Sequence, residues 1–230
     1  MSPREDFAVS VIIPVYNGAI HLQDTLASAL AQSYPPCEIL VVDDGSTDES
    51  AAVIQHMAAT SIIPIRYSHQ ANQGPGAARN AGIARASGGL IALLDQDDLW
   101  LPEKLARQVS ALRQSQDAGY AITHYQLFMN PDMVPPPWIR SARFQGPQAG
   151  FIPSCLVVRA DTFARIGSFD PALRIGNDTD WFVRAHEAPI AMASVPEVLV
   201  MHRVHANNQL RDIEASNRDV LRVVRKALAR

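Results

Sequence analysis

The sequence predicts an α/β fold in which helices flank a mostly parallel, Rossmann-like sheet. Three continuous apolar runs, at residues 8–17, 37–44 and 90–94, have the composition of strands that are buried on both faces. Segments with apolar residues at helical spacing separate these runs. A chain that alternates strand and helix in this way builds right-handed βαβ units on a parallel sheet.

The first half of the chain supplies four such strands. Pro64 predicts an edge position for the third strand, because proline cannot donate to a strand ladder. The expected elements are, in order, a strand at Ala8–Asn17, a helix through Leu22, Leu26 and Leu30, a strand at Cys37–Asp44, a helix from Ser46 or Thr47 to about Ala59, a strand at Ile62–Tyr67, a loop at Gly74–Gly76, a helix at Ala77–Ala86 and a strand at Leu90–Leu94.

The second half is less regular, and we divide the chain into residues 1–117, 118–210 and a C-terminal helix at 211–230. The expected elements are a helix at Pro102–Asp117 with Leu105, Val109 and Leu112 inward, a strand at Tyr120–Phe128, a strand at Phe151–Val158, a helix at Asp161–Ile166, a helix from Asn177 to Glu187, and strands at Ile190–Val195 and Val198–Arg203.

Two segments of this half keep two interpretations each. The proline-rich segment 129–150 is either a lid beside an active site or a simple linker. In the C-terminal helix, a basic residue recurs every fourth position from Arg218 to Arg230. That helix either lies on a membrane surface or packs on its own domain with a solvated basic face.

Composition excludes several classes of protein. The 230 residues carry a net charge of −3, so no global basic field indicates nucleic acid. Cys37 and Cys155 lie far apart and predict neither a disulfide framework nor a zinc site. Without an apolar run of membrane-span length or a signal-peptide core, we expect a cytoplasmic protein.

Acidic residues follow the fourth predicted strand directly, in the run Asp95-Gln96-Asp97-Asp98. Ligands bind at this carboxyl edge of an open α/β sheet. Three neighbouring carboxylates repel one another, and a divalent cation such as Mg²⁺ or Mn²⁺ would stabilise them. The alternative is that they cap the helix near Pro102, which requires one acid and suits Asp98.

Five motifs in this order resemble the inverting glycosyltransferases of family 2, over about Val9 to Asn208. They read VSVIIPVYNG, EILVVDDGSTD, NQGPGAARNAGIARASG, LLDQDD and GSFDPALRIGNDTDWFVRA. The resemblance implies a GT-A fold with a smaller mixed acceptor-binding part. It also implies a metal-dependent, hexosyltransferase-type enzyme that moves a sugar from a UDP-sugar to a saccharide or other hydroxyl acceptor in cell-surface polysaccharide biosynthesis.

Nucleotide-binding residues are expected at the ends of the first two strands. Pro14, Tyr16 and Asn17 can line a base pocket, and Asp44 can accept a hydrogen bond from the uracil imide N–H. The resemblance places Arg79 beside the nucleotide as well.

The resemblance also assigns the acids. Asp97 becomes the main metal ligand and Asp95 faces the ribose or a metal-bound water. The segment MHRVHANN resembles the family's Arg-x-His segment, in which His205 would join the metal and Arg203 would meet phosphate.

Inversion requires a base on the face of the sugar opposite the leaving group. The family usually has Glu-Asp here, whereas this chain has Asn177-Asp178, so Asp178 is the expected base. Asp180 is expected to act only at the helix start, and Asp178 has the alternative role of an N-cap.

Two other classes of protein were weighed. A nucleotidyltransferase usually has Arg and Lys in a glycine-rich loop after the first strand, but PVYNGAIHLQ has no basic residue. A non-catalytic nucleotide-sugar or carbohydrate-binding relative would keep Asp97 and lose the base. Asp178 argues against that alternative, whereas Asn177 keeps it open.

The enzyme would act in the cytoplasm or at the inner membrane face.

Overall fold

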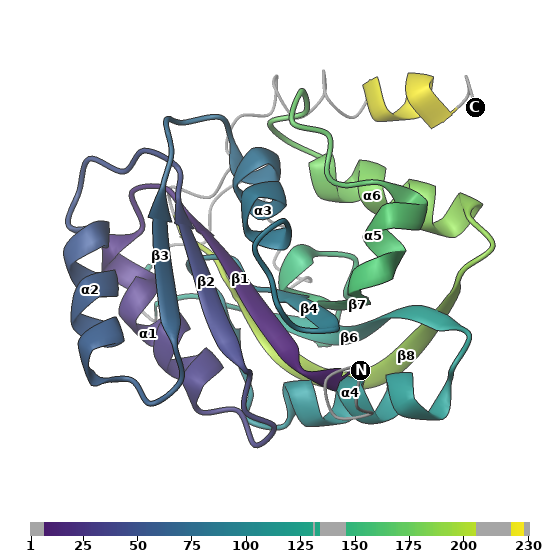
Figure 1. The fold of residues 1–230 in the computed structure, drawn as a ribbon, viewed down its shortest axis with the longest axis horizontal. Helices are drawn as coiled ribbons and strands as arrows, with labels where there is room; N and C mark the ends of the chain where they lie inside the picture. The colour runs from purple at the N-terminus through teal and green to yellow at the C-terminus, as the bar shows by residue number, and fades with distance from the viewer. Residues whose placement is uncertain (1–6, 131, 134–145, 206–221, 228–230) are drawn as a thin grey trace.

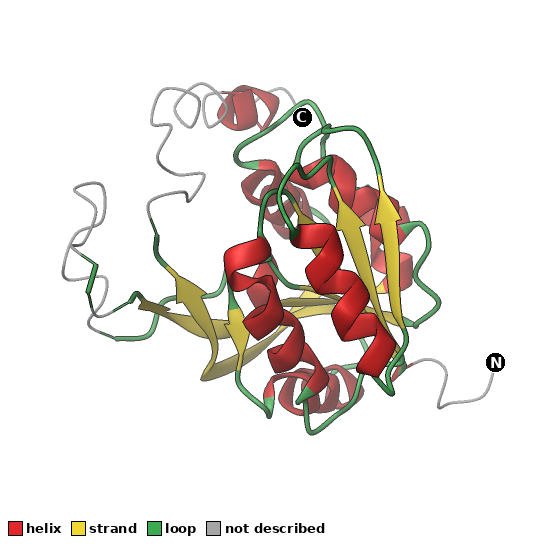
Figure 2. Ribbon diagram, turned by 90° about the vertical axis from the view of Figure 1, so that its left-hand side faces the viewer, coloured by secondary structure: helices red, strands yellow, loops and turns green. Residues whose placement is uncertain are grey.

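The computed structural model describes residues 7–130, 132–133, 146–205 and 222–227. One eight-stranded sheet runs through both halves in the order β3-β2-β1-β4-β7-β6-β8-β5, with helices on both faces (Figures 1 and 2). The strands are β1 Val9–Val15, β2 Glu38–Asp43, β3 Ile65–His69, β4 Leu90–Leu93, β5 Leu99–Trp100, β6 Ala118–Phe128, β7 Leu156–Arg159 and β8 Ala191–Arg203. The helices are α1 Ala19–Leu30, α2 Ser50–Thr60, α3 Pro75–Ile83, α4 Lys104–Gln114, α5 Ala160–Ile166 and α6 Asn177–Glu187, with a 3-10 turn η3 at Pro153–Cys155.

Strands β1 to β4 are parallel, as the sequence predicts, and β3 lies at the edge. All seven residues of β1 are buried, because successive side chains enter two different cores. Val11 and Ile13 face the core under α1, α2 and α4, while Ile12 faces the core under α3, α5 and α6. A Cβ on Gly82 would lie 2.5 Å from Cγ2 of Ile12, so this glycine lets α3 pack directly on β1.

The second half makes the sheet mixed. Strand β7 pairs antiparallel with both β4 and β6, β8 runs parallel to β6, and β5 pairs antiparallel with β8. The predicted α/β architecture, a parallel part joined to a smaller mixed part, is therefore confirmed.

Several details of the predicted elements are wrong. The helix expected from Ser46 or Thr47 begins at Ser50, after the cap residue Glu49. The two strands expected at 190–203 form one strand, β8, whose register to β6 shifts between Val195 and Val198. Pro196 lies in that interval and has no N–H for the ladder, so the strand bulges without ending. The strand expected from Phe151 starts only at Leu156, after η3, and the two-residue β5 was not predicted.

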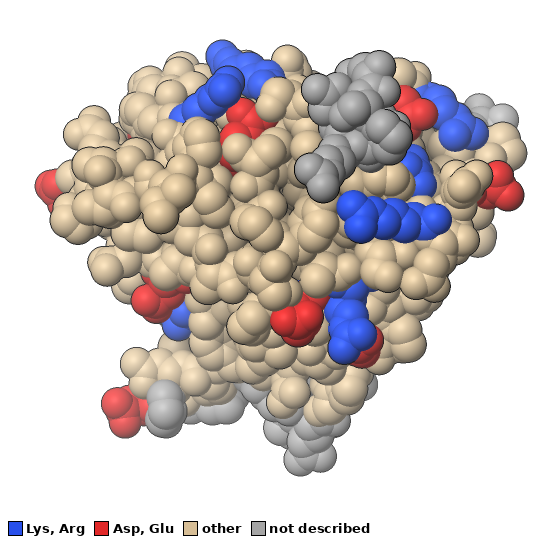
Figure 3. Space-filling view, turned by 60° about the horizontal axis from the view of Figure 1, so that its bottom comes forward, with Lys and Arg blue, Asp and Glu red and all other residues tan. Residues whose placement is uncertain are grey.

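The central part of the proline-rich segment, 134–145, and most of the C-terminal helix lie outside the described residues, so the lid and membrane-helix predictions stay predictions. Each helix in the described part of the chain is too short or too polar to span a bilayer. On the face shown in Figure 3, Lys and Arg side chains are scattered among Asp and Glu, in keeping with the absence of a broad basic field there.

Candidate functional site

The candidate site lies at the carboxyl edge of the parallel strands. Strands β1, β2 and β4 end at Val15, Asp43 and Leu93, and because they are parallel their following loops meet at one edge. The predicted nucleotide, metal and base residues come from the end of β1, from these loops, from α3, from the start of α6 and from the residues just after β8.

The acidic turn is held from the second half of the chain by Ser154. The Ser154 hydroxyl donates to Asp98 Oδ2 over 2.5 Å and accepts the backbone N–H of Asp95 over 3.1 Å. Its carbonyl accepts the Trp100 indole N–H over 2.8 Å. Ser154 is fully buried, so it fixes both ends of the turn; no motif in the sequence indicates this role.

Asp98 does not cap a helix, which corrects the capping prediction. Helix α4 begins only at Lys104, after the cap residue Glu103, and has no side-chain cap hydrogen bond. The fully buried Asp98 instead accepts hydrogen bonds from the backbone N–H of Arg203, over 3.0 Å, and from Nδ1 of His202, over 2.8 Å. Burial alone would lower the pKa of His202, but the charge and hydrogen bond of Asp98 raise it to about 9. The charged pair locks the end of β8 onto the turn.

The two predicted metal ligands meet beside this pair. Nε2 of His205 lies 2.8 Å from Oδ2 of Asp97, and both side chains retain some solvent exposure. Arg203 donates to the Asp97 carbonyl over 2.9 Å and lies 3.5 Å from Asp24, so its guanidinium also braces this loop. The His21 ring lies 5.0 Å from that of His205, and burial lowers the pKa of His21.

This donor set fits a divalent cation that is completed by its substrate. Within the residues that the structure describes, no group of three or more His, Cys, Asp or Glu side chains surrounds a single point. Magnesium is usually held by one or two carboxylates together with phosphate oxygens and water. Asp97, with His205 beside it, matches such a partial site.

Arg79 joins the acidic turn to the helix that carries the predicted base. Its guanidinium donates to Asp95 over 2.6 Å and to the Asn177 side-chain oxygen over 2.8 Å, and it lies over the Phe169 ring at 5.6 Å. The next residue, Asn80, exchanges two hydrogen bonds with the Phe169 backbone. The Arg-Asn pair of α3 therefore docks the segment before α6 against the first half of the chain.

Asp178 lies in the first turn of α6, half-buried, and accepts the Thr179 N–H over 2.8 Å. The N-cap is Gly176, at φ +77°, so the alternative of Asp178 as the N-cap is wrong. Burial raises the pKa of Asp178, the Arg79 charge lowers it and the Asp95 charge raises it, with a net increase. The base candidate and the acidic turn thus share one electrostatic environment.

Asp180, near the start of α6, pairs along the helix with Arg184 over 2.8 Å.

The predicted base-pocket residues bracket the end of β1. Pro14 is buried inside the strand, while Tyr16 and Asn17 are exposed just beyond it. Gln96 of the acidic turn accepts the Tyr16 N–H over 2.8 Å and donates back to the Tyr16 carbonyl. Asn17, at φ +50°, accepts the backbone N–H of Thr47 over 2.8 Å. These hydrogen bonds therefore tie the loops after β1, β2 and β4 to one another.

Asp44 is only 3% exposed and positions the glycine segment. Its carboxylate accepts the backbone N–H groups of Gln73 and Gly74, over 2.9 and 2.7 Å, and the side-chain amide of Gln70 over 2.8 Å. Gly74 has φ +91°, which glycine adopts without strain. The contact of Asp44 with uracil stays a prediction, but its hold on the segment before α3 was not foreseen.

Comparison with known proteins agrees with this geometry. The model of the family described as "Glycosyl transferase family 2" matches residues 10–167. A Rickettsia felis protein named "Uncharacterized glycosyltransferase" is 33% identical over 223 residues, which cover 92% of this chain and 36% of that protein. The chain thus spans about a third of the length of this relative.

Solved structures share the fold at low sequence identity. TarS from S. aureus, in complex with UDP, has a TM-score of 0.69 and 19% identity over 93% of this chain and 65% of that chain. The mannosyltransferase PcManGT from Pyrobaculum calidifontis, in complex with GDP-Man and Mn²⁺, has a TM-score of 0.74 and 18% identity over 96% and 64%. With the fold, the ordered motifs and the match over residues 10–167 in agreement, this chain belongs to glycosyltransferase family 2 and has the GT-A fold.

Proposed function

We propose that this chain transfers a sugar from a UDP-sugar to an acceptor hydroxyl in a single inverting displacement that requires Mg²⁺ or Mn²⁺. One observation carries the proposal: Arg79 bonds both Asp95 of the acidic turn and Asn177 at the start of α6. It thereby sets the leaving-group side of the site against Asp178, the candidate base.

On the leaving-group side, Asp97 and His205 would hold the cation. The cation would supply Lewis-acid stabilisation of the charge that develops on the diphosphate. Tyr16, Asn17 and Asp44 lie where the uridine would bind, on loops that are already hydrogen-bonded to one another. The UDP and the GDP-Man with Mn²⁺ in the two similar structures support a nucleotide-sugar donor and a divalent ion.

On the acceptor side, Asp178 would take the proton of the attacking hydroxyl. Its pKa is raised by burial, which makes the carboxylate a stronger base than an exposed aspartate. The acceptor is a saccharide or another hydroxyl compound of a cell-surface polymer, and the enzyme would work in the cytoplasm or at the inner membrane face.

The donor can be tested before any acceptor is known, because such enzymes can pass the sugar slowly to water. We expect one member of a panel of UDP-sugars, with GDP-mannose included, to be hydrolysed in the presence of Mg²⁺ or Mn²⁺ but not in EDTA. Hydrolysis that continues in EDTA contradicts the metal requirement. A chain that binds a nucleotide sugar tightly but never cleaves or transfers it would support the non-catalytic alternative.

A further inference from the structure

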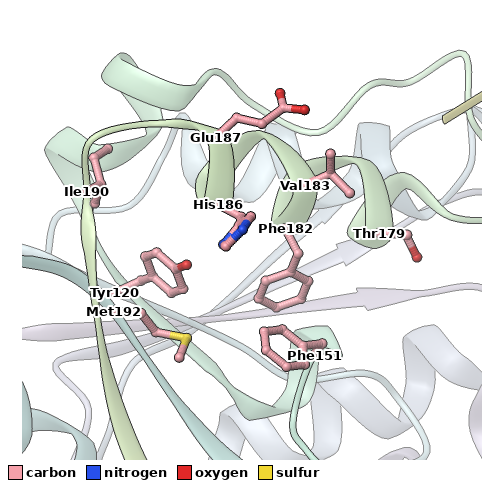
Figure 4. Close-up of a pocket in the computed structure, with 9 residues that line it drawn as sticks. All are labelled: Tyr120, Phe151, Thr179, Phe182, Val183, His186, Glu187, Ile190 and Met192. Atoms are coloured by element: carbon pink, nitrogen blue, oxygen red, sulfur yellow. The ribbon is translucent and has the colours of Figure 1, made fainter. Parts of the chain in front are cut away.

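A pocket of ≈ 550 Å³ opens between α6 and the beginnings of β6 and β8 (Figure 4). Its volume lies in the range of small-molecule sites, about 300–1,000 Å³. Apolar side chains make up most of its wall, and the polar side chains of Thr179, His186 and Glu187 come from α6. None of the pocket residues belongs to the nucleotide, metal or base set described above.

The wall exposes large apolar side chains to solvent. Phe151 is 51% exposed and Met192 39% exposed, and both line the pocket. The Phe151 ring packs edge-on against Phe182 of α6, with the centroids 5.5 Å apart. A concave cluster of partly exposed apolar side chains is typical of a binding site.

One buried polar group points into this apolar pocket. Tyr120 is only 4% exposed, its ring packs edge-on against Trp181, and its hydroxyl is directed into the cavity (Figure 4). The hydroxyl makes no hydrogen bond to any residue in the described part of the chain. Burial raises the pKa of Tyr120, so the phenol keeps its proton and can donate one hydrogen bond. The hydroxyl itself keeps some accessible surface inside the pocket, so the oxygen of a ligand that enters the pocket can become its partner.

The pocket begins beside the proposed base. Thr179, at one end, directly follows Asp178, and the wall continues along α6 to His186 and Glu187 and on to Ile190. Eleven helical residues rise about 16 Å. A molecule whose hydroxyl reaches Asp178 can therefore extend along the helix into the pocket.

We propose that this pocket binds the apolar body of the sugar acceptor, an aliphatic or aromatic group joined to the part that carries the reacting hydroxyl. Tyr120 donates a hydrogen bond to an oxygen on that group, and Phe151, Phe182 and Met192 enclose its carbon atoms. This inference rests on the proposed function for the identity of the occupant, whereas the pocket's preference for an apolar ligand can be measured by binding alone.

Three glucosides that differ only in their aglycones test the inference: methyl, phenyl and 4-acetylphenyl β-glucoside. Calorimetry on the full chain, with UDP and Mn²⁺ present, measures each dissociation constant. We expect phenyl glucoside to bind at least fivefold more tightly than methyl glucoside, and the acetyl carbonyl to add a further gain of a few-fold. Equal dissociation constants for all three glucosides would overturn the proposal.

Variants of the pocket separate the contribution of the Tyr120 hydrogen bond from that of the apolar wall. Tyr120→Phe should abolish the gain from the acetyl group and keep the preference for phenyl over methyl, whereas Phe151→Ser should reduce that preference. Ile62→Ser replaces a fully exposed apolar residue outside the pocket and should change neither ratio. If Tyr120→Phe and Phe151→Ser both keep the wild-type ratios, the pocket is not the site.

Two further results would bear differently on the proposed function and on the pocket. Preferential binding of the aryl glucosides without transfer from any nucleotide sugar would contradict the proposed function and leave the pocket intact. A wild-type dimer in size-exclusion chromatography that Phe151→Ser converts to a monomer would show that a second copy covers the pocket, and would overturn the proposal.

Discussion

The proposed donor side and the proposed acceptor side of this site differ in the chemistry of their walls. On the proposed donor side, Asp44, Asn17 and Gln96 are all hydrogen-bonded to neighbouring loops. On the proposed acceptor side, along α6, the pocket wall is mostly apolar, the Tyr120 hydroxyl bonds to no residue in the described part of the chain, and Phe151 is half exposed. The proposed donor side is thus a set of polar loops that brace one another, whereas the proposed acceptor side is an apolar pocket with one hydroxyl directed into it.

The largest effect should come from a change that breaks the acceptor side alone. Asp178→Asn removes the proposed base and keeps the shape of the side chain, so we expect the transfer rate to fall roughly 10³-fold. The dissociation constant of UDP, measured by calorimetry, should change less than about twofold, because no donor loop contains Asp178.

Asp117→Asn, at an exposed position before β6, is the matched control and should leave both values unchanged. A variant Asp178→Asn that still transfers sugar would place the base elsewhere.

A change on the proposed donor side should weaken UDP binding and leave binding in the acceptor pocket unchanged. Removing divalent ions with EDTA, or replacing Asp97 by Ala, should weaken UDP binding by roughly a hundredfold, since a diphosphate then loses its main countercharge. Binding of phenyl glucoside without nucleotide should be unaffected, because its pocket contains no metal ligand. Equal UDP affinity with and without chelator, in calorimetry, would remove the metal from the mechanism.

A smaller effect is expected at Ser154, which makes two hydrogen bonds to the acidic turn. Ser154→Ala leaves the buried carboxylate of Asp98 without one donor and the Asp95 N–H without its acceptor. A hydrogen bond to a charged group contributes about 1.5–3 kcal/mol, so the free energy of unfolding should fall by about 2 kcal/mol.

Thermal and urea unfolding measure this change, with the exposed Ser110→Ala as the control. UDP affinity in Mn²⁺ should also fall, because the turn carries Asp97. An unchanged unfolding midpoint would mean that the Ser154 contacts contribute nothing to the turn.

The sequence predicted that the candidate site residues lie at one sheet edge, where the structure brings them together, but it did not predict the contacts that connect them. Strand ends with polar residues predicted the sheet edge, and the helical spacing of Leu105, Val109 and Leu112 predicted the buried face of α4. The same pattern did not foresee that Lys104 is also buried, where desolvation lowers its pKa to about 7 and its ammonium lies 3.8 Å from the centroid of the Trp100 ring. Periodicity identifies a helix face, but long-range packing decides how wide it is.

The same limit applies to the site itself. Ser154 and His202 act through contacts that span 56 and 104 residues, and no local pattern signals such pairs. Asp44 was identified as important from its place at a strand end, but its bonds to Gln73 and Gly74 depend on how the loop after β3 returns. In the sequence Tyr120 is an ordinary strand residue, and only the structure shows that its hydroxyl is directed into a cavity.

The smallest effect on activity is expected at Asn177, whose hydrogen bond to Arg79 connects the two sides of the site. Asn177→Ala removes the acceptor for one Arg79 N–H, while the Arg79–Asp95 pair remains. The start of α6 then loses a neutral-to-charged hydrogen bond to the donor side, and we expect kcat to fall about tenfold with little change in UDP affinity.

Asn177→Asp keeps an acceptor for Arg79 and should restore most of the rate. Its added negative charge lies next to Asp178 and should raise the pKa of that base further, which moves the acidic limb of the rate profile to higher pH. A merely structural role for Asn177 would lower the rate without moving that limb. A pH profile of kcat for the two variants and the wild type therefore decides whether this residue, where the family usually has Glu, adjusts the base or only holds the helix.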